Sequence, residues 1–303
     1  MTTVVDRGRL WWLVLRAQAQ AWKAYPRRPD ERRLLQERAE VLLQGTSRSD
    51  DPKRLARRQF VERRVTWRLA ERYELVRHLR VDGLAHVDAA HARGRGAVIA
   101  TVHGSWPLII ANLLAWRGRP VTAGVGARLL HKQTPRDHQV AGAIDELLAF
   151  GGSVAYAGTG AFGQLERAVQ AGGFAWTAID MPGSLRLSYL GKPANVGKAA
   201  FQIAWSNGAP VLPAFVRRRG LSGRVVVMPP LQPTDYVDFE SFCAAVCTVV
   251  EQEVLAHLAA YDSAAVGALW PNGDAEGAVP NRAVWQRRVA TEEFEDAVNE
   301  PGS

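Results

Sequence analysis

From residue 80 onward, short apolar segments alternate with longer amphipathic ones, and this alternation constrains the fold more than any other feature. The apolar segments have the length of strands and the amphipathic ones the length of helices. Such alternation is typical of α/β proteins, whose central sheet is covered by helices. We therefore expect an α/β fold with a mostly parallel sheet. The predicted strands span 97–102, 120–125, 153–157, 174–179 and 210–215, and the predicted helices span 84–93, 106–116, 138–149, 162–171, 196–207 and 238–260. VVVMPPLQPTD adds a predicted edge strand.

The 303-residue chain divides into three regions by the texture of its sequence. Residues 1–80 form a helical N-terminal region with breaks at Pro26–Asp30 and Gln44–Pro52. Residues 81–270 form the α/β domain. Residues 271–303 form an acidic tail, with seven acidic and three basic residues from Gly273 onward.

The positive charge of the chain lies in its N-terminal region. The formal net charge is +8, but residues 1–80 hold 20 Lys and Arg against 10 Asp and Glu, a balance of +10. Trp11, Trp12, Trp22 and Trp67 lie in the same region. This mixture suits an anionic membrane surface or an acidic carrier protein. It also fits a solvated helical face with tryptophans in the core. No nucleic-acid-binding motif is present, so we expect no nucleic acid partner.

The cysteines and apolar runs predict a cytoplasmic protein. Cys243 and Cys247 lie four residues apart, which favours one helix face and core thiols over a disulfide framework or a metal site. No apolar run approaches the roughly 20 residues of a membrane span. The apolar core Leu10–Leu15 has no small-residue cleavage site after it, so we expect no signal peptide.

GTGAFG at residues 158–163 matches the dinucleotide-binding pattern of glycines. It follows a predicted strand and opens a predicted helix, and Asp180 lies at a suitable distance downstream. A nucleotide-dependent enzyme using Gly158–Gly163 is therefore one hypothesis. A glycine-rich loop of an ordinary α/β protein is the alternative, because the preceding strand is short.

An ordered set of motifs covers residues 78–235. It comprises RVDGLAHVDAAHARGRGAVIATVHGSWPLI, GGFAWTAIDMPG, LSYLGKPANVGKAAFQIAWSNGAPVLPAF and MPPLQPTD. In this order the motifs resemble the lipid A late acyltransferases (lauroyl and myristoyl transferases), a lysophospholipid acyltransferase-type family, and the related mycobacterial mannoside acyltransferases. The resemblance implies a glycerolipid acyltransferase-like fold. It also implies an acyl-carrier-protein or coenzyme A thioester as co-substrate, with no bound cofactor.

The family motif is a histidine followed, five positions on, by a carboxylate, and this chain departs from it. Counted from His103, the acid position holds Leu108, and counted from the Gly-Ser-Trp segment it holds Pro107. In the family the histidine deprotonates the acceptor and the carboxylate orients the imidazole. We expect His103 to be the general base and Asp180 to replace the missing acid. Both residues follow predicted strands, at the sheet edge where α/β proteins place their sites.

Five further residues are candidates for substrate binding. Ser105 and Trp106 lie beside His103, Ser105 with the chemistry of a helix N-cap. A solvated surface explains Arg128 and Arg186 equally well, and the core or the wall of an acyl tunnel explains Tyr189 equally well.

Together these features predict an acyltransferase that transfers an acyl group to a hydroxyl or amine of a lipid, glycolipid or specialised metabolite. We expect it to be peripheral to the inner membrane. The alternatives are a catalytically silent protein that binds an acyl chain or a partner, and the nucleotide-dependent enzyme above.

Overall fold

The computed structural model describes residues 4–44, 46, 48–70, 79–104, 108–130, 135–219, 222–261 and 269. Within these residues the central sheet has seven strands in the order β1-β9-β8-β2-β5-β3-β4. Only β8 and β9 pair antiparallel in this sheet, and the other neighbours pair parallel. The predicted α/β fold with a mostly parallel sheet is confirmed. The strands are β1 (Arg80–Asp82), β2 (Ala97–Thr101), β3 (Val121–Val125), β4 (Ser153–Tyr156), β5 (Phe174–Ala178), β8 (Val211–Arg219) and β9 (Ser222–Val227).

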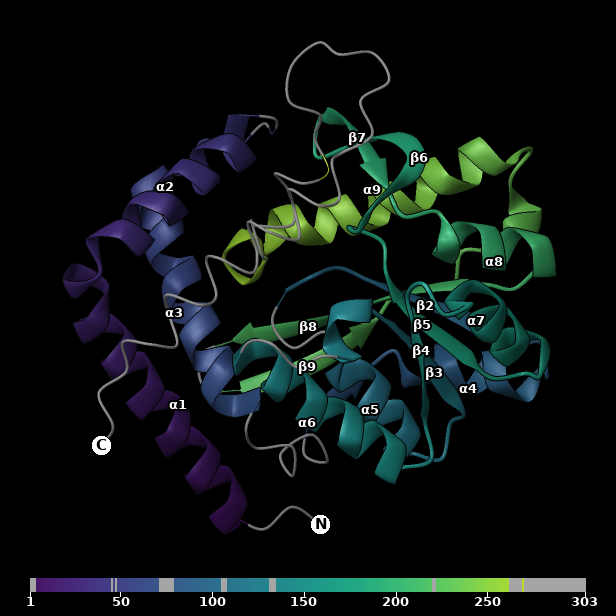
Figure 1. Ribbon diagram of the computed structural model, residues 1–303, viewed down its shortest axis with the longest axis horizontal. Coiled ribbons are helices and arrows are strands. Elements are labelled where there is room, and N and C mark those ends of the chain that lie inside the picture. The colour runs from purple at the N-terminus through teal and green to yellow at the C-terminus, as the bar shows by residue number, and fades with distance from the viewer. Residues whose placement is uncertain are drawn as a thin grey trace.

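Helices cover both faces of the sheet (Figure 1). The alternation of side chains along β2 sends Val98 and Ala100 into one core cluster and Ala97 and Ile99 into another. The first cluster contains side chains of α7 (Ala161–Gln170), α8 (Ala199–Asn207) and α9 (Phe239–Ala256). The second contains side chains of α4 (Leu84–Ala92), α5 (Ile109–Trp116) and α6 (Pro135–Ala149). All five residues of β2 are buried, as expected for a strand covered on both faces.

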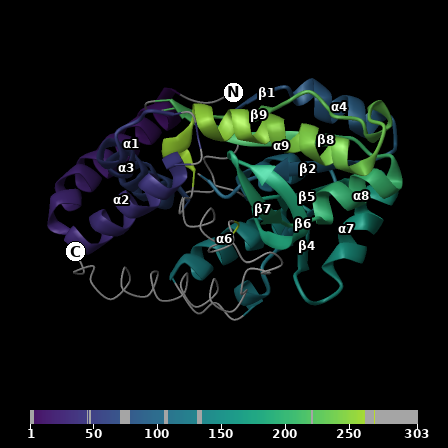
Figure 2. The same ribbon diagram turned by 90° about the horizontal axis from the view of Figure 1, so that it is seen from above.

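Three long helices precede the sheet and gather at one end of the molecule (Figure 2). They are α1 (Val4–Ala24), α2 (Pro29–Gln44) and α3 (Pro52–Ala70), with a 3₁₀ turn at Tyr25–Arg27. The predicted breaks therefore match the ends of these helices. Helix α3 packs against α1, α2 and the 3₁₀ turn η5 (Leu258–Ala260). Phe60 of α3 is fully buried in the cluster that also holds the core of α9, so the helical region shares a core with the α/β region.

The chain after Asp180 forms a β-hairpin, which the sequence did not predict. Strands β6 (Pro182–Tyr189) and β7 (Lys192–Val196) form a separate antiparallel pair. The predicted helix 196–207 consequently begins later, at Ala199. The two turn residues, Leu190 and Gly191, have φ angles of +52° and +77°, which a tight hairpin turn requires. Leucine gives no sequence signal for such a turn. Here the side chain of Glu251 on α9 fixes the turn by accepting the Leu190 N–H at 2.8 Å.

The prediction that the strand before MPPLQPTD lies at an edge is wrong. β9 lies between β8 and β1, and β1 is the edge strand on that side. Only three residues of β1 make this pairing, and they lie more than 140 positions before their partners, for example Arg80 opposite Arg224. Such a contact leaves no local pattern in the sequence.

The cysteines are core residues, as predicted. Cys243 and Cys247 are free thiols buried on α9, and burial raises the pKa of each to about 12. Among the described residues no helix combines the length and the apolar character needed to cross a membrane. The acidic tail 271–303 and the side chain of Trp67 lie outside what the structure describes.

Candidate active site

His103 and Asp180 meet at the carboxyl edge of the sheet. β2 and β5 are parallel neighbours, and their last residues, Thr101 and Ala178, are paired. The residues just after them therefore leave the sheet side by side. The Nδ1 atom of His103 lies 2.8 Å from Asp180 Oδ1, and the backbone N–H of His103 donates to Asp180 Oδ2 at 2.7 Å. The Asp180 side chain is fully buried, whereas that of His103 is 26% exposed.

At β2 and β5 the connections between strands also change direction: one runs toward one edge of the sheet and the other toward the opposite edge. The connection from β2 runs to β3 through α5, which packs in the cluster of Ile99. The connection from β5 runs the opposite way to β8, through α8 on the other face. A crevice forms where neighbouring connections diverge, and open α/β sheets bind their ligands there. The pair thus occupies the position that this topology favours for a site.

The geometry determines what the imidazole can do. When Nδ1 carries its hydrogen and donates to Asp180, Nε2 is the nitrogen that accepts a proton. The carboxylate holds the ring in one orientation and stabilises the imidazolium that forms. The second hydrogen bond, from the His103 backbone, fixes the carboxylate itself. A histidine held in this way has the chemistry that a general base requires.

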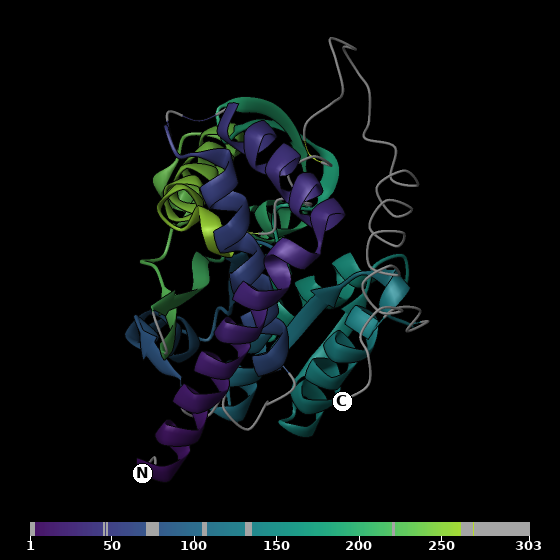
Figure 3. The ribbon, with the colours of Figure 1, turned by 90° about the vertical axis from the view of Figure 1, so that its left-hand side faces the viewer.

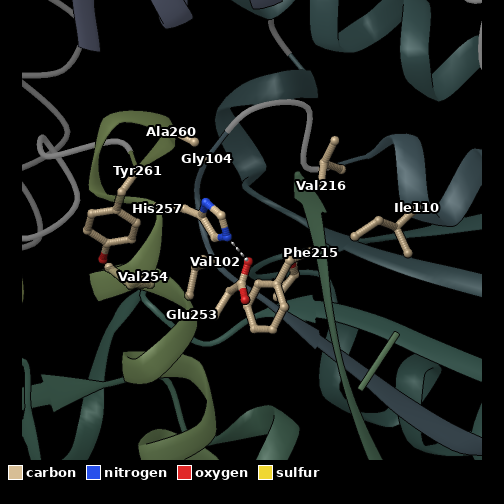
Figure 4. Close-up of a pocket in the computed structure, with 11 residues that line it drawn as sticks. Val102, Gly104, Ile110, Phe215, Val216, Glu253, Val254, His257, Ala260 and Tyr261 are labelled. Carbon is tan, nitrogen blue, oxygen red and sulfur yellow. Dashed lines mark ion pairs between the residues drawn. The ribbon is translucent and has the colours of Figure 1, made fainter. Parts of the chain in front are cut away.

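A pocket lies beside the loop that carries His103 (Figure 4). Residues on both sides of His103, Val102 and Gly104, line it, and Gly104 also pairs with Tyr261 in an isolated β-bridge. A side chain at Gly104 would bring a Cβ atom within 2.9 Å of the Ala260 carbonyl oxygen, so glycine permits this close approach. Most of the wall is apolar. The other lining residues are Thr101, Ile110, Phe215, Val216, Glu253, Val254, His257 and Ala260.

A second histidine and carboxylate line this pocket, and the sequence analysis missed them. His257 Nε2 lies 3.5 Å from Glu253 Oε1, one helical turn earlier on α9. Arg217 of β8 donates from Nε to Glu253 Oε1 at 2.8 Å and also binds Oε2. Glu253 in turn raises the pKa of Arg217, through the hydrogen bond and its charge. The three consecutive arginines that end β8, Arg217–Arg219, predict an exposed charge run. That prediction is wrong for Arg217, which is half-buried and ion-paired to a buried carboxylate.

Of the five candidates for substrate binding, the structure describes the side chains of Arg186 and Tyr189. Ser105 and Trp106 lie outside the described residues, as does the side chain of Arg128 in the 3₁₀ turn Ala127–Leu130. Arg186 is exposed on β6. Tyr189 is fully buried at the end of β6, where burial and then the Asp180 charge raise its pKa well above the usual value. Their roles in substrate binding stay predictions.

The glycine-rich loop does have the predicted strand and helix around it, since β4 precedes it and α7 follows. Asp180, however, does not support a nucleotide there. Its strand β5 is separated from β4 by β3, and both of its carboxylate oxygens are bound to His103. The acid that would hold a ribose is thus committed elsewhere, which disfavours the nucleotide hypothesis. In the described part of the chain, no three His, Cys, Asp or Glu side chains gather to hold a metal ion.

Comparison with known proteins finds a likeness among solved structures, but none among family models or curated proteins. No family model matches the chain, and no curated protein matches it. Among solved structures, the chain is similar to the 1-acyl-sn-glycerophosphate acyltransferase PlsC from Thermotoga maritima, with 16% sequence identity and a TM-score of 0.39. The match covers 84% of this chain and 98% of that one.

Proposed function

We propose that this chain is an acyltransferase that moves an acyl group from an acyl-carrier-protein or coenzyme A thioester to a hydroxyl or amine acceptor. The observation that carries the proposal is the contact of 2.8 Å between His103 Nδ1 and Asp180 Oδ1 at the carboxyl edge of two neighbouring strands. It supplies a general base and its orienting acid to a chain whose motifs resemble the late acyltransferases.

In the proposed reaction, Nε2 of His103 takes the proton from the acceptor O–H or N–H as the acceptor attacks the thioester carbonyl carbon. The carbonyl electrons move onto oxygen and form a tetrahedral intermediate. As the carbonyl re-forms, the carbon–sulfur bond breaks. The imidazolium then returns the proton to the departing thiolate, so that the products are an ester or amide and a free thiol.

Two features support an intact acyltransferase site over a site that has lost its catalytic acid. At the acid position counted from His103, the chain has the buried Leu108, so the usual carboxylate is absent, while Asp180 reaches the same imidazole from the next strand. The apolar wall of the neighbouring pocket, with Val102, Ile110 and Phe215, also suits the hydrocarbon part of a substrate.

The test is cleavage of defined thioesters. Purified protein is incubated with palmitoyl-CoA or with palmitoyl-acyl carrier protein and a panel of lipid alcohols, glycolipids and amines. Released thiol is measured, and acylated products are identified by mass spectrometry. We expect wild type to form a product that depends on the acceptor, and His103→Ala to lose it.

Other outcomes distinguish the alternatives. Donor that binds, as seen by native mass spectrometry, but is never consumed in the presence of any acceptor would indicate a catalytically silent binder. A clear rise in melting temperature with NAD(H) or NADP(H) and none with the thioesters would instead favour the nucleotide hypothesis, since a ligand at 100 times its Kd adds about 2.7 kcal/mol of stability.

A further inference from the structure

Helix α1 has two apolar faces, and only one of them is packed. Val14, Ala17 and Ala21 are buried, with exposed fractions of 4% or less. An adjacent side of the helix carries Trp11, Trp12, Leu15 and Trp22, which are 46–57% exposed. We call these four residues the tryptophan stripe.

The spacing of the stripe places it along one side of the helix. Trp11, Leu15 and Trp22 lie four and seven residues apart, so they share one face, and Trp12 flanks them. At 1.5 Å per residue the stripe is about 16 Å long. Figure 3 shows α1 along the outer side of the helical region. Folding needs only the buried face, so packing within the described chain does not account for the stripe.

Cations border the stripe. The Arg57 guanidinium of α3 lies 3.8 Å from the centre of the Trp22 ring, and that of Arg16 lies 5.2 Å from the Trp12 ring. Lys23 is exposed next to Trp22. In helices α1 and α3, the described side chains that are exposed include six cations and no acid. The cations are Arg16, Lys23, Lys53, Arg54, Arg57 and Arg58.

We propose that the tryptophan stripe docks α1 lengthwise on the surface of an anionic lipid bilayer. Tryptophan favours the boundary between headgroups and acyl chains, and an amphipathic helix with cations beside it lies in that plane. The cations would meet lipid phosphates, each contributing about a fivefold gain in affinity near an anionic surface. An acidic carrier protein would match the charges, but a bilayer also accommodates an apolar stripe along the whole face of a helix. This proposal does not depend on the acyl-transfer activity.

The experiment measures binding of the full chain to vesicles. We compare vesicles of phosphatidylcholine alone with vesicles that also contain phosphatidylglycerol, by sedimentation and by tryptophan fluorescence. We expect binding to the anionic vesicles, with a blue shift of the emission, and weaker binding at high salt because the charges are screened.

Three variants separate lipid insertion from general stickiness. The triple variant Trp11→Gln, Leu15→Gln, Trp22→Gln should bind at least about tenfold more weakly, because burial of one large apolar side chain is worth about that much. Arg16→Gln with Lys23→Gln and Arg57→Gln should weaken binding to anionic vesicles only. The matched control is Trp116→Gln. Trp116 is 40% exposed on α5 and also has an arginine, Arg117, over its ring, so its loss should leave binding unchanged.

Circular dichroism must show that each variant keeps its helical content and melts cooperatively. The proposal is overturned if wild type does not bind anionic vesicles, or if the stripe variant, still folded, binds as tightly as Trp116→Gln. It is also overturned if the stripe is needed only for binding an acyl carrier protein, which would make the face a protein interface.

Discussion

Two histidine–carboxylate pairs lie at the same edge of the sheet, and they differ in what else holds the carboxylate. Asp180 binds His103 through both oxygens, one to the ring and one to the backbone N–H. Glu253 is bound at both oxygens by Arg217, and its contact with His257 is longer, at 3.5 Å. The main partner of Asp180 is therefore a histidine, whereas the main partner of Glu253 is an arginine.

The difference shows that a histidine near an acid is not in itself a catalytic pair. A carboxylate whose charge is matched by a guanidinium has little left to orient an imidazole or to stabilise its positive form. Glu253 instead joins α9 to β8. His257 lies at the C-cap of α9, outside the last turn of the helix. We therefore expect the first pair to govern turnover and the second to govern stability.

The largest expected effect comes from removing each ring in turn. His103→Ala should lower turnover of the thioester by about 10²–10⁴, the usual loss of a general base, with the melting temperature little changed. His257→Ala should retain most of the activity. Steady-state release of thiol on both purified variants makes the comparison. Equal losses in the two variants would contradict the assignment of distinct roles.

The next effect tests whether Asp180 acts through His103. Asp180→Asn should lower turnover by roughly 10² or more, because the ring loses its orienting charge. The double variant His103→Ala, Asp180→Asn should be little worse than His103→Ala alone, since residues that act as a unit are not additive. Additive losses in the double-mutant cycle would mean that Asp180 supports the site without acting through this ring. Loss of stability in Asp180→Asn without loss of turnover per folded molecule would make it a structural residue.

A smaller effect, on folding, is expected at the second pair. Glu253→Gln leaves the half-buried Arg217 without its counter-charge and should lower the free energy of unfolding by about 2 kcal/mol, below the usual loss for a fully buried pair. Urea denaturation measures it. The double variant Arg217→Met, Glu253→Leu removes both charges and should recover part of the loss. Lower turnover per folded molecule in Glu253→Gln, at unchanged stability, would assign the pair to the reaction.

The smallest effect is expected for His257→Asn. Its ring is 44% exposed and its contact with Glu253 is long, so the free energy of unfolding should change by less than about 1 kcal/mol. The same urea titration, carried out on both variants, compares the loss of unfolding free energy in His257→Asn with that in Glu253→Gln. A loss as large as that of Glu253→Gln would show that His257, and not Arg217, is the main partner of the carboxylate.

The sequence by itself determined the features that arise from local pattern. Apolar periodicity and glycine-rich turns located the main strands and helices, because a strand or a helix face is specified by residues within one short window. The same logic placed Cys243 and Cys247 in the core of α9, with four-residue spacing on one face. It also put His103 and Asp180 at the ends of strands, and thus at the edge of the sheet where sites form.

Only the tertiary structure decided which of these elements became neighbours. His103 and Asp180 are 77 residues apart, and they touch because β5 inserts next to β2 and not because of any spacing in the chain. Arg217 and Glu253 pair across 36 residues, which turned an apparent surface charge into a half-buried one. Strand β1 covered β9, and a leucine formed the β6–β7 turn because α9 supplied its hydrogen-bond acceptor. Each of these contacts depends on strand order and packing, which are set by the burial of whole elements against one another and leave no trace in a local window of residues.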